Sequence, residues 1–191
     1  VGGGLAGISC AYLLQKEGYQ IAILESDRIC QGTTAHTTAK ITSQHGLIYN
    51  KIQNKMGTEL AKQYAEANES AIDEFKKIVE ENQIQCDYVS QSAFVYTQQE
   101  KYIQKIQDEV KVASSLGIDA SYIDEIPFPI PIKGGIRFDN QAQFHPRKYL
   151  LELARIIDGN VKIFENTRAV NIEEDSNYII TTEQEKKVRG K

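Results

Sequence analysis

The sequence predicts an α/β fold in which a domain of alternating strands and helices is interrupted by an α+β lobe. Three observations predict it. A glycine-rich turn, Gly2 to Gly7, opens the first helical segment, a short apolar run follows that helix, and residues 141–191 return to one helix and short strands. Strand, helix and strand in this order are typical of a parallel sheet covered by helices, whereas the middle of the chain has a different pattern.

The N-terminal third alternates between regular elements and one long irregular region. Leu5 to Glu17 predicts a helix, because apolar side chains recur at three- and four-residue steps and Gly18 follows as a stop. Gln20 to Glu25 is a short apolar run, typical of a strand buried on both faces. Residues 26–46 lack periodicity and are rich in Thr, Ser and Gly, and loops of this length are usually functional.

The middle of the chain is expected to hold two helices and two strands. Gly57 to Asn82 predicts a long amphipathic helix, whose buried stripe would contain Leu60, Tyr64, Ala67, Ala71, Phe75 and Ile78. Residues 92–97 alternate like a strand, and residues 102–116 have helical periodicity. Three prolines between 127 and 131 exclude regular structure before a second strand at 133–138.

The C-terminal part begins with a helix from Pro146 to about Ile157, because proline is favoured in the first helical turn. Residues 161–164, 168–172 and 178–182 are expected to be short strands. We interpret the polar stretch 183–191 as a turn that leads elsewhere.

These elements predict three segments: 1–86 and 141–191 form the strand-and-helix domain, and 87–140 form part of the lobe. A glycine turn of this kind normally follows a buried strand, yet here it follows Val1 directly. The expectation is a fragment truncated at both ends.

Composition narrows the classes of function. With 41% apolar residues the chain can form a core, and no apolar run approaches the roughly 20 residues that cross a bilayer. The net charge of −4 disfavours nucleic acid or an anionic membrane as the main partner. The three cysteines are widely spaced without a C-x-x-C pair, which suits a reducing cytoplasm and offers no metal site. Cys10, on the first helix, is expected to be a buried, inert thiol.

Gly2, Gly4 and Gly7 complete a G-x-G-x-x-G motif. The first glycine permits a tight turn, the second lets the backbone approach a pyrophosphate, and the third lets helix and strand pack closely. Glu25 ends the next strand at the position expected of a carboxylate that bonds a ribose hydroxyl. Together these features predict dinucleotide binding, with the phosphates at the start of the helix.

The long region after Glu25 favours FAD over NAD. An NAD domain usually enters its next helix within a few residues, whereas residues 26–46 continue without helical periodicity. An extended, hydroxyl-rich segment of this length could lie along a ribityl chain and a flavin ring. An NAD(P)-dependent dehydrogenase stays open as the alternative.

Several segments carry a resemblance to a known family. VGGGLAG, the strand ending in ES, and GTTAHTTAK resemble the D-amino-acid oxidase and glycine oxidase family of FAD-dependent oxidoreductases, as do QAQFHPRKYLLELA and FENTRAVNIEED. The TTAHTTAK segment is most similar to the corresponding segment of a subgroup whose members carry a C-terminal Rieske iron–sulfur domain. The chain contains no C-x-H…C-x-x-H ligand set, so any Rieske [2Fe-2S] cluster would lie outside it.

The resemblance implies a Rossmann-like FAD-binding domain with an inserted α+β substrate (cap) lobe. Besides the motif glycines, the implied FAD contacts are Leu5 and Ala6 at the pyrophosphate, Glu25 and Ser26 at the ribose, Thr33 and Thr34 near the phosphates or ribityl chain, Thr38, Ala39 and Lys40 along the flavin ring, and Ala169 at the adenine. Lys40 departs from the family, which often has a small residue there. Its ammonium could stabilise negative charge on the reduced flavin or point to solvent, and both stay open.

The function that the resemblance implies is FAD-dependent oxidation of an amine or amino-acid-like substrate, by hydride transfer to the flavin. No catalytic residue is named, because the cofactor supplies the reactivity. Arg137 and Arg147 could meet a substrate carboxylate, but solvent exposure or a structural ion pair is the favoured interpretation. An incomplete, non-catalytic dinucleotide-binding fragment is a further alternative, and the fragment alone is expected to be inactive. Substrate, electron acceptor and oligomeric state stay open.

Overall fold

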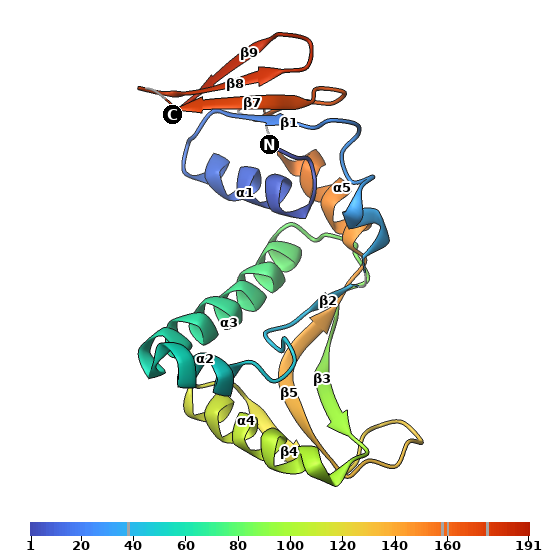
Figure 1. Cartoon of the computed structure of the whole chain (residues 1–191). Helices are drawn as coiled ribbons and strands as arrows, with labels where there is room; N and C mark the ends of the chain where they lie inside the picture. Colours follow the sequence, from blue (N-terminus) through green and yellow to red (C-terminus); the bar gives the residue numbers. More distant parts are fainter. Residues whose placement is uncertain (38, 158, 160, 175) are drawn as a thin grey trace. The chain divides into compact units, whose positions relative to one another are not determined.

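A computed structural model describes residues 1–37, 39–157, 159, 161–174 and 176–191. The chain forms two compact units (Figure 1). The first contains Val1–Thr38, Asn82–Cys86 and His145–Lys191, and the second contains Ala39–Glu81 and Asp87–Phe144. These bounds differ from the predicted segments 1–86, 87–140 and 141–191, because residues 39–81 pack within the second unit.

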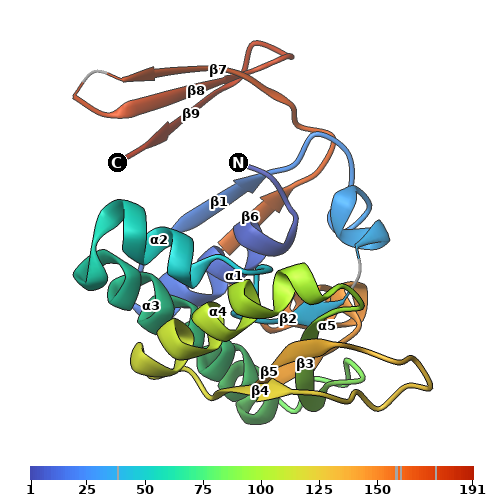
Figure 2. The ribbon, with the colours of Figure 1, turned by 60° about the horizontal axis from the view of Figure 1, so that its bottom comes forward.

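The first unit combines a parallel strand pair, two helices and an antiparallel sheet. Its elements are α1 (Leu5–Lys16), β1 (Ile21–Leu24), a 3-10 turn η1 (Thr33–His36), α5 (Pro146–Ile156), β6 (Val161–Phe164), β7 (Ala169–Glu174), β8 (Tyr178–Thr182) and β9 (Lys187–Gly190). β1 and β6 pair in parallel with Ile23 opposite Ile163, and the N–H of Gly2 donates to the Leu24 carbonyl at 2.8 Å. α1 lies against α5, and both contribute buried apolar residues. Figure 2 shows β1 and β6 side by side.

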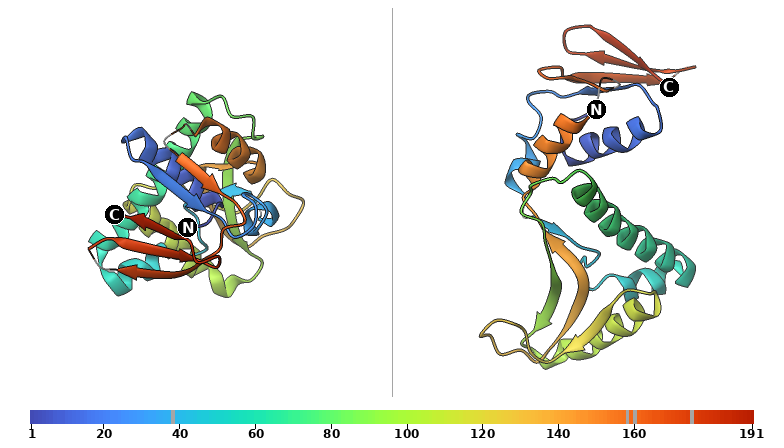
Figure 3. Two further views of the ribbon diagram at one scale, coloured as in Figure 1. Left: turned by 90° about the horizontal axis from the view of Figure 1, so that it is seen from above. Right: turned by 180° about the vertical axis from the view of Figure 1, so that it is seen from behind.

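Two expectations for this unit are wrong. β1 is not buried on both faces, because Ala22 is exposed and lines an open hollow of about 480 Å³ with Ile180 and Val188. Residues 183–191 do not lead elsewhere: Glu185 adopts a left-handed φ of 60° in a tight turn, and β9 returns to pair with β8. Figure 3 shows β7, β8 and β9 as adjacent strands.

The other predicted helices and strands of this unit are confirmed to within about two residues.

The second unit is an antiparallel sheet covered on one face by helices. Its strands are β2 (Lys40–Ile41), β3 (Val89–Thr97), β4 (Ala120–Ile123) and β5 (Gly134–Gln143), and its helices are α2 (Tyr49–Met56), α3 (Thr58–Glu81), the short η2 (Glu100–Tyr102) and α4 (Ile103–Ser115). β5 is central and pairs with the other three strands. The core joins Ile136 and Phe138 of β5 to Tyr49, Ala61 and Ile106 from the helices.

The long helix is confirmed as α3, but its predicted buried stripe is partly wrong. Leu60 is 45% exposed, and Ala67 and Ala71 are exposed as well, whereas Ala61 and Ala65 are fully buried. The cause is α2, which the periodicity did not predict. Gly57, with φ 88°, ends α2 and the chain turns into α3, so that α2 packs on α3 and the small alanines face the core.

Candidate functional site

The glycine turn at the start of α1 has the close packing that its spacing predicts. Gly2 has a φ of 98°, a backbone conformation that side chains disfavour. A Cβ added to Gly7 would lie 1.9 Å from the Gly2 carbonyl oxygen, inside the closest possible contact. Only glycine at position 7 therefore lets α1 approach the turn this closely.

The N-terminus of α1 has the properties of an anion site. Its N-cap residue is Gly4, which supplies no side-chain cap, and the first turn has no acidic residue. The Leu5 N–H lies 3.4 Å from the hydroxyl of Thr34, on η1. The positive end of the helix dipole and the backbone N–H groups of the first turn, which includes Ala6 and Gly7, favour a negatively charged group here.

Glu25 lies directly at this turn. One carboxylate oxygen accepts the Gly3 N–H at 2.7 Å, and the other accepts the Asp27 N–H at 2.9 Å and the Ser26 hydroxyl at 3.0 Å. Burial alone would raise the pKa of Glu25, but the hydrogen bonds from Asp27, Gly3 and Ser26 together lower it. The strand-end acid and the glycine turn, separated by 22 positions, thus form one ionised, pre-oriented unit.

After β6 the chain passes beside Glu25 and Asp27. The Thr167 N–H donates to the Glu25 carbonyl at 2.7 Å, and the Asn166 N–H donates to the Asp27 carbonyl at 2.8 Å. Ala169 begins β7 two residues later. Glu25, Ser26 and Ala169, which the resemblance places around an adenosine, therefore lie in one region of the first unit.

Two further residues shape this region and were not expected. Gly3 occupies the first variable position of the motif, and a Cβ there would lie 2.6 Å from Ile29 Cγ2, so a larger residue would require the Ile29 side chain to shift. The only signal for it was the run of three glycines. Glu165 accepts the Ile29 N–H at 2.9 Å and so holds the loop after β1. It stands in a segment that carried the resemblance, but no spacing rule indicated its role.

The residues predicted near the phosphates or ribityl chain belong to the first unit, and two of those predicted along the flavin ring belong to the second. Thr33 and Thr34 lie on η1, and a Cβ on Gly4 would lie 3.2 Å from the Thr34 hydroxyl oxygen. Thr38 lies outside the described residues. Ala39 and Lys40 belong to the second unit, where the Ala39 carbonyl accepts the Phe144 N–H and the exposed Lys40 pairs with Gln143.

The remaining candidates have structural explanations. Arg137 forms an ion pair with Asp139 at 2.6 Å and donates from Nε to the Ser92 hydroxyl, so the structural interpretation is confirmed. Burial tends to raise the pKa of Asp139, but Ser92 and Arg137 hold it below its usual value. Cys10 is exposed, contrary to expectation, because α1 buries Ile8, Ala11 and Tyr12 instead.

The described part of the chain contains no group of three His, Cys, Asp or Glu side chains that could hold a metal ion. Nor does any helix there combine the length and apolarity needed to cross a membrane.

Comparison with known proteins agrees with this geometry. The protein YhfW of Bacillus subtilis (strain 168), whose name describes a Rieske 2Fe-2S iron-sulfur protein, is 38% identical over 192 residues, with 100% of this chain and 38% of that protein covered. The structure is similar to L-proline dehydrogenase from P. horikoshii (TM-score 0.74, 14% identity, 98% of this chain, 49% of that one). It is also similar to glycine oxidase from Geobacillus kaustophilus (TM-score 0.73, 16% identity, 99% of this chain, 51% of that one).

This chain therefore spans about two fifths of the curated relative and about half of these solved structures. A family model described as FAD dependent oxidoreductase (DAO) matches residues 1–190. With the glycine turn, the strand-end acid and the fold all in agreement, the chain belongs to this family of FAD-dependent oxidoreductases.

Proposed function

We propose that the first unit binds the ADP part of FAD, with the diphosphate at the N-terminus of α1 and the adenosine beside Glu25. The observation that carries the proposal is the 2.7 Å hydrogen bond between the Gly3 N–H and the Glu25 carboxylate. It joins a glycine-lined helix start, whose N-cap residue has no side chain, to an ionised acid, and these are the two groups that recognise a diphosphate and its neighbouring sugar.

The residues present fit such a ligand. The glycines at positions 2, 4 and 7 leave no side chain between the turn and an approaching phosphate, and Thr34 contributes a hydroxyl at the same helix start. Glu25 accepts three hydrogen bonds, and a carboxylate has about four acceptor positions, so one remains for a sugar hydroxyl. Leu5, Ala6, Ser26 and Thr33 would contribute contacts around these groups.

The family resemblance assigns further residues to the flavin half of the cofactor. In the proposal Thr38, Ala39 and Lys40 line the flavin ring, and Ala169 meets the adenine through its backbone. When bound, FAD supplies a ring that accepts a hydride from the substrate. The protein's part is to hold that ring, orient the substrate and exclude water.

We further propose that the whole enzyme oxidises an amine or amino-acid-like substrate. Support comes from the family match and from the names of the similar structures, which include a proline dehydrogenase and a glycine oxidase. A Rieske cluster, suggested by the name of the Bacillus relative, would lie outside residues 1–191. The three cysteines are widely spaced in the sequence without a C-x-x-C pair, which supports a reducing, cytoplasmic location.

The direct test is to purify the protein from its complete reading frame and identify the released cofactor by absorbance and chromatography. We expect about one FAD per chain, and anaerobic addition of substrate amino acids or secondary amines should bleach the flavin absorbance. Stoichiometric NAD in place of FAD would refute the proposed site. FAD that no amine reduces would refute only the proposed substrate class.

Glu25 provides the sharper prediction. Because charge-assisted hydrogen bonds contribute about 1.5–3 kcal/mol, Glu25→Ala should weaken FAD binding roughly 10- to 100-fold in the complete protein. Glu25→Gln keeps one acceptor oxygen and should lose less. Titration of the deflavinated protein with FAD, followed by flavin fluorescence, measures both, and Glu17→Gln on the exposed end of α1 is the matched control. Unchanged affinity in Glu25→Ala would contradict the assignment.

The same carboxylate predicts a pH dependence. The pKa of Glu25 is lowered in the folded chain, so its contribution to stability is present above its ordinary pKa of 4.5 and is lost as the pH falls through the folded value. Flavin retention should therefore be independent of pH near neutrality and decline only in acid. Glu25→Gln should remove this component of the decline.

A further inference from the structure

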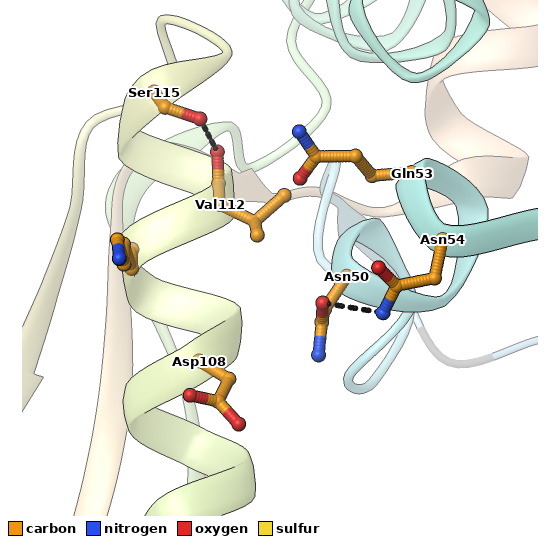
Figure 4. A pocket seen from close by; sticks show the side chains of 7 residues that line it. Asn50, Gln53, Asn54, Asp108, Val112 and Ser115 are labelled. Carbon is orange, nitrogen blue, oxygen red and sulfur yellow. Dashed lines mark hydrogen bonds between the residues drawn. The ribbon is translucent and has the colours of Figure 1, made fainter. Parts of the chain in front are cut away.

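The second unit has a groove between α2 and α4 that is lined by polar and basic side chains. One hollow, of about 480 Å³, lies between Asn50, Gln53 and Asn54 of α2 and Lys111 and Val112 of α4 (Figure 4). A second, of about 350 Å³, shares Asn50 and Asn54 with the first and adds the lysines at positions 51, 55 and 105. Asn50 and Asn54 line both hollows, which therefore lie next to each other along the groove.

The charge of this groove is opposite to that of the chain. Lys51, Lys55, Lys105 and Lys111 are all exposed, and within the described part of the chain none of them forms an ion pair. Lysines elsewhere do: α3 pairs its lysines 62, 76 and 77 with glutamates of the same helix. In a chain of net charge −4, four unpaired ammonium groups around one groove are an uncompensated positive patch.

The carboxylates of the groove do not neutralise this patch. Glu109 is 1% exposed, and its two oxygens accept the N–H groups of Tyr49 and Asn50, which directs its charge into the protein. Asp108 accepts a hydrogen bond from the Gln104 amide at 2.9 Å. The four lysines outnumber these two carboxylates, and all four are exposed residues that line the groove.

The floor of the groove is suited to a polypeptide backbone. The Asn54 side chain donates to the Asn50 side-chain oxygen at 2.9 Å, which leaves the other donors and acceptors of both amides for a ligand (Figure 4). An amide offers a donor and an acceptor together, as a peptide group requires. The lining contains no arginine, the residue that favours bidentate phosphate recognition, so a peptide is favoured over nucleic acid.

We propose that the α2–α4 groove docks a short acidic segment of a partner protein. Lys105 lines one of the two hollows and Lys111 lines the other, so a docked segment that spans both would meet a lysine of α4 in each. Two or three adjacent Asp or Glu side chains would pair with the lysines while the backbone meets Asn50 and Asn54. The contact is small, so the association is weak, salt-sensitive and rapid.

The test uses the complete protein and the fluorescein-labelled peptide Gly-Glu-Glu-Glu-Gly, with binding followed by fluorescence anisotropy. We expect saturable binding at about 20 mM NaCl that weakens strongly at about 300 mM. Replacing the four groove lysines (Lys51, Lys55, Lys105 and Lys111) with glutamine should weaken binding about tenfold or more. Asn50→Ala should weaken it several-fold with no change in charge.

The control is a variant with the same change of net charge away from the groove, carrying glutamine at Lys62, Lys76, Lys186 and Lys187. At about 100 mM NaCl, where the Debye length is about 10 Å, its affinity should stay within about twofold of the unmodified protein, since charges far from the docked segment are then largely screened. Thermal unfolding of both variants checks that each is folded. Equal weakening in the control would overturn the proposal, as would equal binding of a Gly-Gln-Gln-Gln-Gly peptide or tighter binding of a single-stranded oligonucleotide of the same charge.

Discussion

Replacing Gly7 with alanine is expected to abolish FAD retention and to lower the free energy of unfolding by about 3 kcal/mol. The added Cβ would lie 1.9 Å from the carbonyl oxygen of Gly2, and that atom belongs to the backbone, so no side-chain rotation relieves the contact. α1 would have to move away from the turn. That movement would separate the helix N-terminus from Glu25, which holds the turn through the Gly3 N–H.

The measurements are the flavin-to-protein absorbance ratio after gel filtration and unfolding in urea. Gly190→Ala is the matched control, because a Cβ at position 190 meets nothing within 4 Å. It should keep both its flavin and its stability. A Gly7→Ala protein with full flavin content would show that α1 does not need this close approach.

Replacing Glu109 with alanine is expected to lower the free energy of unfolding by about 3–4 kcal/mol, since each buried donor left unsatisfied costs about 1–3 kcal/mol. The side chain of Glu109, from α4, caps the start of α2 by accepting the N–H groups of Tyr49 at 2.7 Å and Asn50 at 2.9 Å. Alanine would leave both donors without an acceptor, and Tyr49 is fully buried.

Glu109→Gln separates the contributions, because its single carbonyl oxygen can satisfy one of the two donors, and we expect about half of the loss. Asp108→Ala changes the neighbouring residue, whose side chain bonds only Gln104 among the described contacts, and should stay within about 0.5 kcal/mol of the unmodified protein. Urea unfolding measures the stabilities, and hydrogen exchange should show α2 opening first. A stable Glu109→Ala protein with a protected α2 would contradict this account.

These two positions show where sequence reasoning succeeds and where it stops. Gly7 belongs to a local motif whose spacing alone predicts close packing, because all of its contacts arise within one turn and the helix that follows. Glu109 bonds Tyr49 and Asn50, which lie 60 and 59 positions earlier in the chain, and no local sequence pattern indicates these contacts. α2 was missed for the same reason: its sequence, YNKIQNKM, has few apolar residues, and its start is held by a side chain from another helix.

The buried face of α3 also depends on contacts with a separate element. Leu60, Ala67 and Ala71 satisfy helical periodicity, and yet they are exposed, while Ala61 and Ala65 are fully buried. Alanine is only weakly hydrophobic, so a prediction of the buried face from hydrophobic periodicity favours Leu60 over its neighbour Ala61. Which face is buried depends on α2, against which α3 packs, and two helices approach closely where the side chains are small.

By itself, the sequence determined the glycine turn, the acid that ends β1, the order of most helices and strands, and the family resemblance. Each of these depends on residues near one another in the chain, where spacing and backbone sterics decide the outcome. Only the tertiary structure decided that a side chain at position 3 would meet Ile29, that Glu165 holds the loop after β1, that residues 39–81 pack in the second unit, and that four lysines line two adjacent hollows of α2 and α4. The physical reason is that these features arise from contacts between distant segments, which form only when the core brings them together.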